Sequence, residues 1–321
     1  MNILKDIRTE LLKSEVKIRD TRYLSLHRRA LANILSKSNR TIPHASGIGE
    51  LDVTNLMEWY ERVKADAEND GVRITITAVI IKVFAETLAR NPMLNAFFEY
   101  NPWRTRGMLH LCEDVNIMFT IDTPKGVFSP VIRNADKKSL YEIARNVDRL
   151  ARVSRVSNTN KALQGVMKKY VMWSLIGLRP LMWVETIRHI IYGVILRRAP
   201  KSKRVYQEVP DEDRIRPEDL LGATFTLTNP GMRTRGVPTN MIVIPPLVSV
   251  VGIGEVRKTP VVIDDKIEIR SIMRMGMSID HRAIDGGPVF KFTETLRDIV
   301  ANPAKYITVQ ETAHGKEPAK S

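Results

Sequence analysis

The segment from Asp280 to Pro288 constrains the fold of this chain most, because it joins an alternating strand to a helix through a short turn. His281 and Asp285 lie four residues apart within it, and two glycines precede Pro288. Glycine allows close backbone approach, and proline suits the first turn of a helix. Histidine has an ordinary pKa that suits proton transfer near neutral pH. The segment therefore predicts a general base held between a strand and a helix.

Composition indicates a globular protein with a reduced thiol. The 321 residues are 43% hydrophobic and 27% charged, enough to bury the core of one large domain or two ordinary ones. Cys112 is the one cysteine, which excludes a disulfide framework and fits a cytoplasmic protein. Its thiol is either a nucleophile or inert packing beside an apolar strand. Met1 to Lys17 contain no uninterrupted apolar run of the kind a secretory signal needs.

Periodicity predicts an α/β layered domain, in which helices cover one side of a mixed sheet. Helical spacing covers residues 25–38, 54–69, 75–90, 139–152 and 287–301. Extended or strand patterns cover 41–53, 115–122, 128–133, 223–227, 240–244, 248–253, 261–269 and 271–278. Asn91-Pro92 should end the second helix, and Ser139 with Glu142 forms a capping box for the fourth.

Four ordered motifs carry a resemblance to a known family. They are His-Arg-Arg-Ala-Leu-Ala at 27–32, Thr-Ile-Pro-His at 41–44, Ala-Thr-Phe-Thr-Leu-Thr-Asn-Pro-Gly-Met at 223–232 and Asp-His-Arg-Ala-Ile-Asp-Gly at 280–286. Together they resemble the catalytic domain of the dihydrolipoamide acyltransferase component of 2-oxoacid dehydrogenase complexes. This resemblance implies a two-layer sandwich with the chloramphenicol acetyltransferase-like fold over residues 20–155 and 214–307. Residues 1–19 would form an N-terminal extension, 156–213 an inserted helical module and 308–321 a flexible tail.

The resemblance also implies roles for four residues. His281 would be the general base, and Thr228 would supply the hydroxyl that stabilises the oxyanion. The family usually has serine at that position, so threonine keeps the donor and adds a methyl group. Asp285 would hold its loop through an ion pair with Arg28 on the first helix. The family's active site lies between subunits of a homotrimer, so His281 and Thr228 would come from different chains.

Structural alternatives remain for each of these side chains. His281 could be a core histidine, Asp285 the acid of a helix N-terminus, and Thr228 the end of a strand. His44 lies where the family has a histidine near its substrate channel, and it is either a contact or a structural polar residue. No third ligand stands at a spacing that would make His281 and Asp285 a metal site.

We expect the acyl donor to be a coenzyme A thioester or a lipoyl or other carrier protein acting in trans. Fewer than 20 residues precede the region of resemblance, and we interpret Asp136-Lys137-Lys138 as a solvated turn rather than a lipoylation site, so no covalently bound lipoyl group is expected. The segment Ile-Pro-Pro-Leu at 244–247 is apolar where the family usually has Asn and Gln. It suggests a more apolar substrate or compensated packing.

The inserted module combines apolar and basic residues. Between Lys161 and Arg204 there are ten Lys or Arg and one acid, giving 10 − 1 = +9 out of a net charge of +14 for the whole chain. No apolar run reaches the roughly 20 residues of a membrane span. Two amphipathic helices within 162–204 could contact an anionic membrane surface, with Trp173 and Trp183 at the interface. The alternatives are a hairpin that packs on its own domain or a neighbouring subunit, or another partner. The charge comes with no nucleic-acid motif, so nucleic acid is not an expected partner.

The sequence thus predicts an acyltransferase that moves an acyl group from a thioester, with coenzyme A favoured, to a thiol, hydroxyl or amine. A different class of function is a non-catalytic scaffold that keeps the fold and assembles partners through the insertion. Binding of a coenzyme A thioester distinguishes the two, because a scaffold has no reason to bind one. Assembly beyond a homotrimer is left open.

Overall fold

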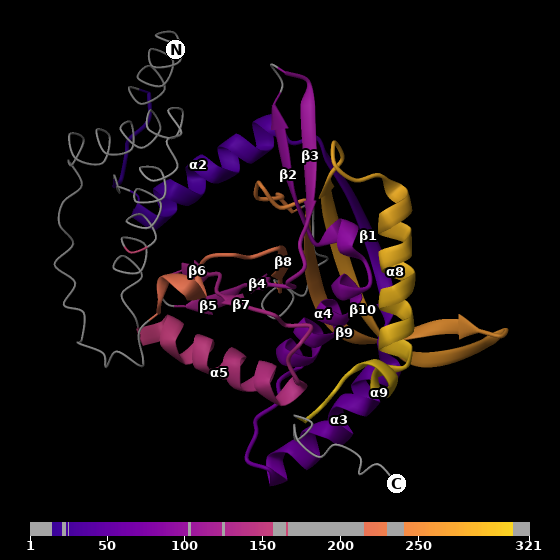
Figure 1. Ribbon diagram of the computed structural model, residues 1–321. Helices are drawn as coiled ribbons and strands as arrows, with labels where there is room; N and C mark the ends of the chain where they lie inside the picture. The colour runs from indigo at the N-terminus through magenta and orange to yellow at the C-terminus, as the bar shows by residue number, and fades with distance from the viewer. Residues whose placement is uncertain are drawn as a thin grey trace, which may run out of the picture.

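A computed structural model describes residues 15–20, 24, 26–101, 104–123, 126–156, 165, 215–229 and 241–310 (Figure 1). The predictions for 1–14, for nearly all of the insertion and for 311–321 lie outside these residues. A mixed six-stranded sheet runs in the order β1-β10-β9-β8-β4-β7. Its strands are β1 (His44–Asp52), β4 (Ile117–Phe119), β7 (Val131–Ile132), β8 (Phe225–Thr228), β9 (Ser249–Ile263) and β10 (Lys266–Asp280). β8 is parallel to β4 and β9, whereas the other neighbouring pairs are antiparallel.

Helices cover this sheet and enclose one large core. The helices are α2 (Leu26–Thr41), α3 (Thr54–Asn69), α4 (Ile76–Ala89), α5 (Leu140–Val156), α8 (Gly286–Ala301) and α9 (Pro303–Tyr306), with short 3-10 turns η1 (Pro92–Leu94) and η3 (Pro217–Asp219). Phe84 of α4, Phe225 of β8 and Phe292 of α8 meet with ring centroids 6.1–6.5 Å apart. The three rings are fully buried and tie the helical layer to the sheet. The predicted α/β fold class is confirmed.

Sequence signals within the helices and at their ends predicted the positions of α3, α4 and α5. α3 spans the predicted residues, and the hydroxyl of Thr75 accepts a hydrogen bond from the N–H of Ala78 at the start of α4. At α5 the Ser139 N–H donates to Glu142 Oε2, while the Glu142 N–H donates to Ser139 Oγ. This is the reciprocal capping box that the sequence predicted. None of the helices in the described ranges is long and apolar enough to cross a membrane.

Several strand predictions were wrong in detail. Residues 115–122 form not one strand but β4 and part of β5 (Ile121–Thr123), which pairs with β6 (Gly126–Phe128) in a separate small sheet. Residues 241–244 are irregular. The predicted strand 261–269 instead contains a hairpin turn at Asp264-Asp265, whose φ angles are 47° and 62°. Both residues accept the left-handed conformation that a tight two-residue hairpin turn requires.

A second hairpin, which the sequence pattern did not predict, projects beside the sheet (Figure 1). It consists of β2 (Ala96–Asn101) and β3 (Arg106–Leu111), which pair antiparallel. Phe97 forms a bridge with Leu247, and the Phe98 N–H donates to the Pro246 carbonyl at 2.8 Å. The hairpin is therefore anchored to the apolar turn just before β9.

We predict that Glu86→Ala lowers the free energy of unfolding by about 2–4 kcal/mol, because it leaves Lys82 buried without its carboxylate. Lys82 is 2% exposed, and its Nζ lies 2.8 Å from Glu86 Oε1. Glu61→Ala is the matched control, since the Glu61–Lys64 pair is exposed and its atoms are 4.0 Å apart. Denaturant unfolding should show less than about 0.5 kcal/mol of loss for the control. Equal losses in both variants would contradict the prediction.

Candidate functional site

His281 stands directly after β10, at the edge where β1 begins. Its N–H donates to the Pro43 carbonyl at 3.1 Å, which ties the loop to the segment before β1. Its ring Nδ1 lies 3.1 Å from the Ile284 carbonyl oxygen. A carbonyl can only accept, so we assign the proton to Nδ1, and Nε2 keeps its lone pair. The half-exposed ring is thereby fixed in the tautomer that a general base needs.

Asp285 lies next to the same ring. Its Oδ1 is 3.6 Å from His281 Nδ1, and its side chain is 88% exposed. Solvent screens a carboxylate this exposed, so the attraction to the ring is weak. Arg28 lies in the first turn of α2, a helix that begins on the side of the molecule away from α8 (Figure 1). The pairing of Asp285 with Arg28 remains a prediction.

Asp280 and Arg282, on either side of His281, form an ion pair that sequence reasoning did not single out. Arg282 Nε and Nη2 donate to the two carboxylate oxygens at 2.9 and 2.6 Å, and the Arg282 N–H donates to Oδ1 at 3.1 Å. Asp280 is 2% exposed, and its hydrogen bond raises the pKa of Arg282 above the ordinary arginine value. The clamp fixes the backbone on both sides of His281.

Thr228 ends β8, at the C-terminal edge of the two parallel strand pairs. Its Oγ1 lies 3.2 Å from Thr120 Oγ1, in the link between β4 and β5. The Asn229 N–H donates to Thr120 Oγ1 at 3.2 Å, so the Thr120 hydroxyl proton can point to Thr228. Thr120 was missed because its role depends on a neighbour more than 100 residues away. The arrangement leaves the Thr228 hydroxyl able to donate elsewhere.

One chain keeps His281 and Thr228 apart. The Asp280 N–H donates to the Val248 carbonyl, whereas Thr228 pairs with Gly252 on the same strand. Four residues of a strand correspond to roughly 13 Å along its axis, and the two side chains are also two strands apart, about 10 Å. The two residues therefore lie at the C-terminal ends of β10 and β8, which point in opposite directions within the sheet. That they meet across a subunit contact stays a prediction.

His44, the other candidate histidine, has a structural partner. It opens β1 and pairs in register with Asp280. Its Nε2 accepts a hydrogen bond from the Val243 N–H at 3.1 Å. The contact explains a polar residue here without a substrate, and it links β1 to the irregular segment 241–244.

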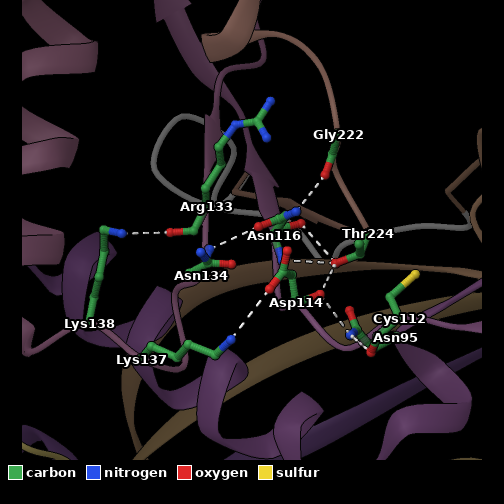
Figure 2. Close-up of polar contacts among 10 residues, drawn as sticks. All are labelled: Asn95, Cys112, Asp114, Asn116, Arg133, Asn134, Lys137, Lys138, Gly222 and Thr224. Carbon is green, nitrogen blue, oxygen red and sulfur yellow. Dashed lines mark hydrogen bonds and ion pairs between the residues drawn. The ribbon is translucent and has the colours of Figure 1, made fainter.

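A polar network around Asn116 joins the two sequence-distant halves of the domain (Figure 2). The Asn116 N–H donates to Thr224 Oγ1 at 2.9 Å, and its Nδ2 donates to the Gly222 carbonyl at 2.9 Å. Its Oδ1 accepts from the Asn134 N–H at 2.8 Å. The Asn116 side chain and the Thr224 hydroxyl are thus engaged by protein groups, whereas Asn95 Oδ1 and Asn134 Oδ1 are buried without a hydrogen-bond partner in the described part of the chain. We assign the network a structural role, in fixing the chain where it returns from the insertion.

Cys112 lines a hollow of about 330 Å³ beside that network. Its N–H donates to the Asn95 carbonyl at 2.9 Å, which holds it beside the end of η1. Burial raises the pKa of the thiol, and the nearby charge of Asp114 raises it further. The thiolate is therefore disfavoured at neutral pH, and the structure supports packing over nucleophilic chemistry. Within the described ranges, no group of three or more His, Cys, Asp or Glu side chains could hold a metal ion.

Comparison with known proteins identifies the family of this chain. The family model for 2-oxoacid dehydrogenases acyltransferase (catalytic domain) matches residues 17–165 and 196–308. Dihydrolipoyllysine-residue acetyltransferase components of pyruvate dehydrogenase complexes are similar over 276 residues, or 86% of the chain. That of Acholeplasma laidlawii is 25% identical and that of Bacillus subtilis 24%. The chain spans only 40% and 49% of the length of these two relatives.

Solved structures show the same fold. The dihydrolipoamide acetyltransferase of Azotobacter vinelandii aligns with a TM-score of 0.67 at 24% identity, covering 92% of this chain and 96% of that one. The cubic core of a pyruvate dehydrogenase multienzyme complex aligns with a TM-score of 0.66 at 23% identity, over the same shares. The family model covers well over half of the chain. The chain therefore belongs to the family of 2-oxoacid dehydrogenase acyltransferase catalytic domains.

Proposed function

We propose that this protein transfers an acyl group between a thioester, most simply of coenzyme A, and a thiol, hydroxyl or amine acceptor. The observation that carries the proposal is the fixed ring of His281, whose Nδ1 is bonded to the Ile284 carbonyl. A half-exposed imidazole with a free Nε2 at the edge of a sheet is the arrangement a general base requires. Family membership makes acyl transfer the first reaction to test.

In the proposed reaction, His281 Nε2 takes the proton of the acceptor thiol as its sulfur attacks the thioester carbonyl. The new carbon–sulfur bond makes a tetrahedral intermediate with an oxyanion. The Thr228 hydroxyl of a neighbouring chain donates to that oxyanion while it accepts from Thr120. Collapse breaks the bond to the thiol of coenzyme A, which leaves with the proton returned by His281. The same steps run in reverse.

The proposed site requires at least two chains, because one chain holds the base and the hydroxyl at strand ends that point in opposite directions. A ring of three copies in which each contributes His281 to one contact and Thr228 to the next would satisfy this. The proposal is supported by a protein of the same fold that forms the cubic core of a pyruvate dehydrogenase multienzyme complex. We infer a homotrimer for this chain, with larger assemblies as a further proposal.

The test is turnover of acetyl-, isovaleryl- and succinyl-coenzyme A with free dihydrolipoamide, followed by release of the coenzyme A thiol. Thermal unfolding with each thioester accompanies it, because a ligand that binds only the native state raises the midpoint. We expect turnover with at least one thioester and a raised midpoint with that thioester. Neither turnover nor a shift with any of them would favour a carrier protein in trans or the scaffold alternative.

Contact between residues 162–204 and an anionic membrane surface is a separate proposal, since all of these residues except 165 lie outside the described ranges. Their excess of basic side chains supports it. Deletion of 166–198 should abolish sedimentation with anionic liposomes. An intact protein that ignores such liposomes at low salt would reject the proposal.

A further inference from the structure

A hollow of about 460 Å³ opens between hairpin β2–β3 and the turn after His281. The register pairs Phe98 with Leu109 and Tyr100 with Gly107, so these four residues share one face of the hairpin. Across the hollow stand Arg282 and Ala283, the two residues that follow the proposed base. The hollow therefore adjoins the loop that carries the proposed base.

Two aromatic rings form the wall on the hairpin side. The rings of Phe98 and Tyr100 are 14° from parallel, with centroids 6.2 Å apart. The Arg282 guanidinium lies 5.4 Å from the Phe98 centroid and 5.8 Å from the Tyr100 centroid. A Cβ at Gly107 would lie 3.2 Å from the Phe98 ring, so the absence of a side chain there keeps the wall open.

The charge of the hollow is already balanced. Arg282 is the one charged residue among the described residues that line it, and its Nε and Nη2 are bound to Asp280. That carboxylate is almost fully buried and cannot turn away to leave the guanidinium unpaired. An anion would therefore gain little attraction and would lose its hydration, whereas ring faces and aliphatic carbons favour a neutral apolar group.

The neighbouring apolar turn supports the same conclusion. Leu247 is buried against Phe97, and the Pro246 carbonyl holds the Phe98 N–H. Backbone groups of Pro246 and Leu247 thus position the strand that carries both rings. They belong to the support of this hollow and not to a separate feature.

We propose that this hollow binds a neutral apolar group of the reacting substrate and sets the preference of the enzyme for such groups. This proposal rests on the proposed acyl transfer, and it specifies substrates with a neutral apolar group. The apolar group can be the acyl chain of the thioester or the apolar part of the acceptor, since both meet at His281. Branched aliphatic or aromatic chains are favoured over acetyl and over chains that end in a carboxylate.

The test compares kcat/KM for isovaleryl-, acetyl- and succinyl-coenzyme A with dihydrolipoamide as the fixed acceptor. The wild-type protein should prefer the isovaleryl thioester. Gly107→Val, which fills the hollow, and Tyr100→Ala, which removes a partly exposed ring, should each lower the isovaleryl-to-acetyl ratio by roughly tenfold or more. Met108→Ala is the matched control. Met108 follows Gly107 on β3, faces away from the hollow and is 40% exposed.

A second arm fixes acetyl-coenzyme A and exchanges dihydrolipoamide for N-acetylcysteamine, a small polar thiol. If Gly107→Val and Tyr100→Ala change only the ratio of kcat/KM between dihydrolipoamide and N-acetylcysteamine, the acceptor occupies the hollow, and the proposal is supported. Unchanged ratios in both arms, or a wild-type preference for succinyl, overturn it while acyl transfer stands. If no thioester turns over, the proposed reaction fails. Binding to the hollow is then tested without turnover. A higher unfolding midpoint with isovaleryl- than with acetyl-coenzyme A, lost in Gly107→Val, supports the hollow as the binding site, and the absence of such a difference overturns it.

Discussion

Replacement of His281 by alanine should lower acyl transfer by at least ~10²-fold, the effect of losing a positioned general base. The ring is half exposed, so its loss opens no core cavity. Its backbone N–H can still donate to the Pro43 carbonyl, and the Asp280–Arg282 clamp still holds the loop. The loss should therefore fall on kcat, with the unfolding midpoint and the oligomeric state close to those of the wild type.

His110→Ala is the control for this variant. His110 lies on β3 and pairs with Phe97, on the face of the hairpin away from the hollow beside the base. Its replacement removes the same side chain without touching the proposed chemistry, so turnover should stay within a few-fold of wild type. Equal turnover of the His281 variant and the wild type would exclude His281 as the base. Full loss in the His110 variant as well would show that the loss of turnover is not specific to the base.

Much of the helical framework was predictable because its signals are local. The Thr75 cap and the Asn91-Pro92 stop bracket α4, and the reciprocal pair of Ser139 and Glu142 begins α5. Each signal acts within four residues of the element it defines. The segment around His281 was predictable for the same reason, since strand, turn and helix follow one another directly.

The parts that escaped prediction depend on distant contacts. Nothing in the local sequence shows that the strand breaks at Thr120, whose hydroxyl contacts that of Thr228 in a parallel neighbouring strand. Phe98 and Tyr100 become the wall of a hollow only when β2 packs against a turn about 180 residues later. Asp264-Asp265 lacks the Asn-Gly or Asp-Gly signal of a tight turn. The prediction therefore ran one strand through this turn, from the end of β9 into the start of β10.

Mixing two inactive variants should restore activity. His281→Ala and Thr228→Ala are each expected to lose most turnover, one through the base and the other through the oxyanion donor. If each site takes His281 from one chain and Thr228 from the next, a Thr228 variant can supply the base and a His281 variant the hydroxyl. Equal amounts assembled at random make about a quarter of all contacts complete. A ring of three that holds both variants has one complete contact in three, so the mixed rings should recover about a third of wild-type activity.

The register of the sheet is the reason to expect this result. Thr228 pairs with Gly252 while Asp280 meets Val248, so no rotation of either side chain brings the two groups together within one chain. Differently tagged variants, co-expressed and purified through both tags, give the mixed oligomers whose turnover is measured. Thr228→Ser in place of Thr228→Ala is the control, because it keeps the hydroxyl and should be active alone. Mixed oligomers no more active than the separate variants would place the working site within a single chain, and the assignment of Thr228 would have to be abandoned.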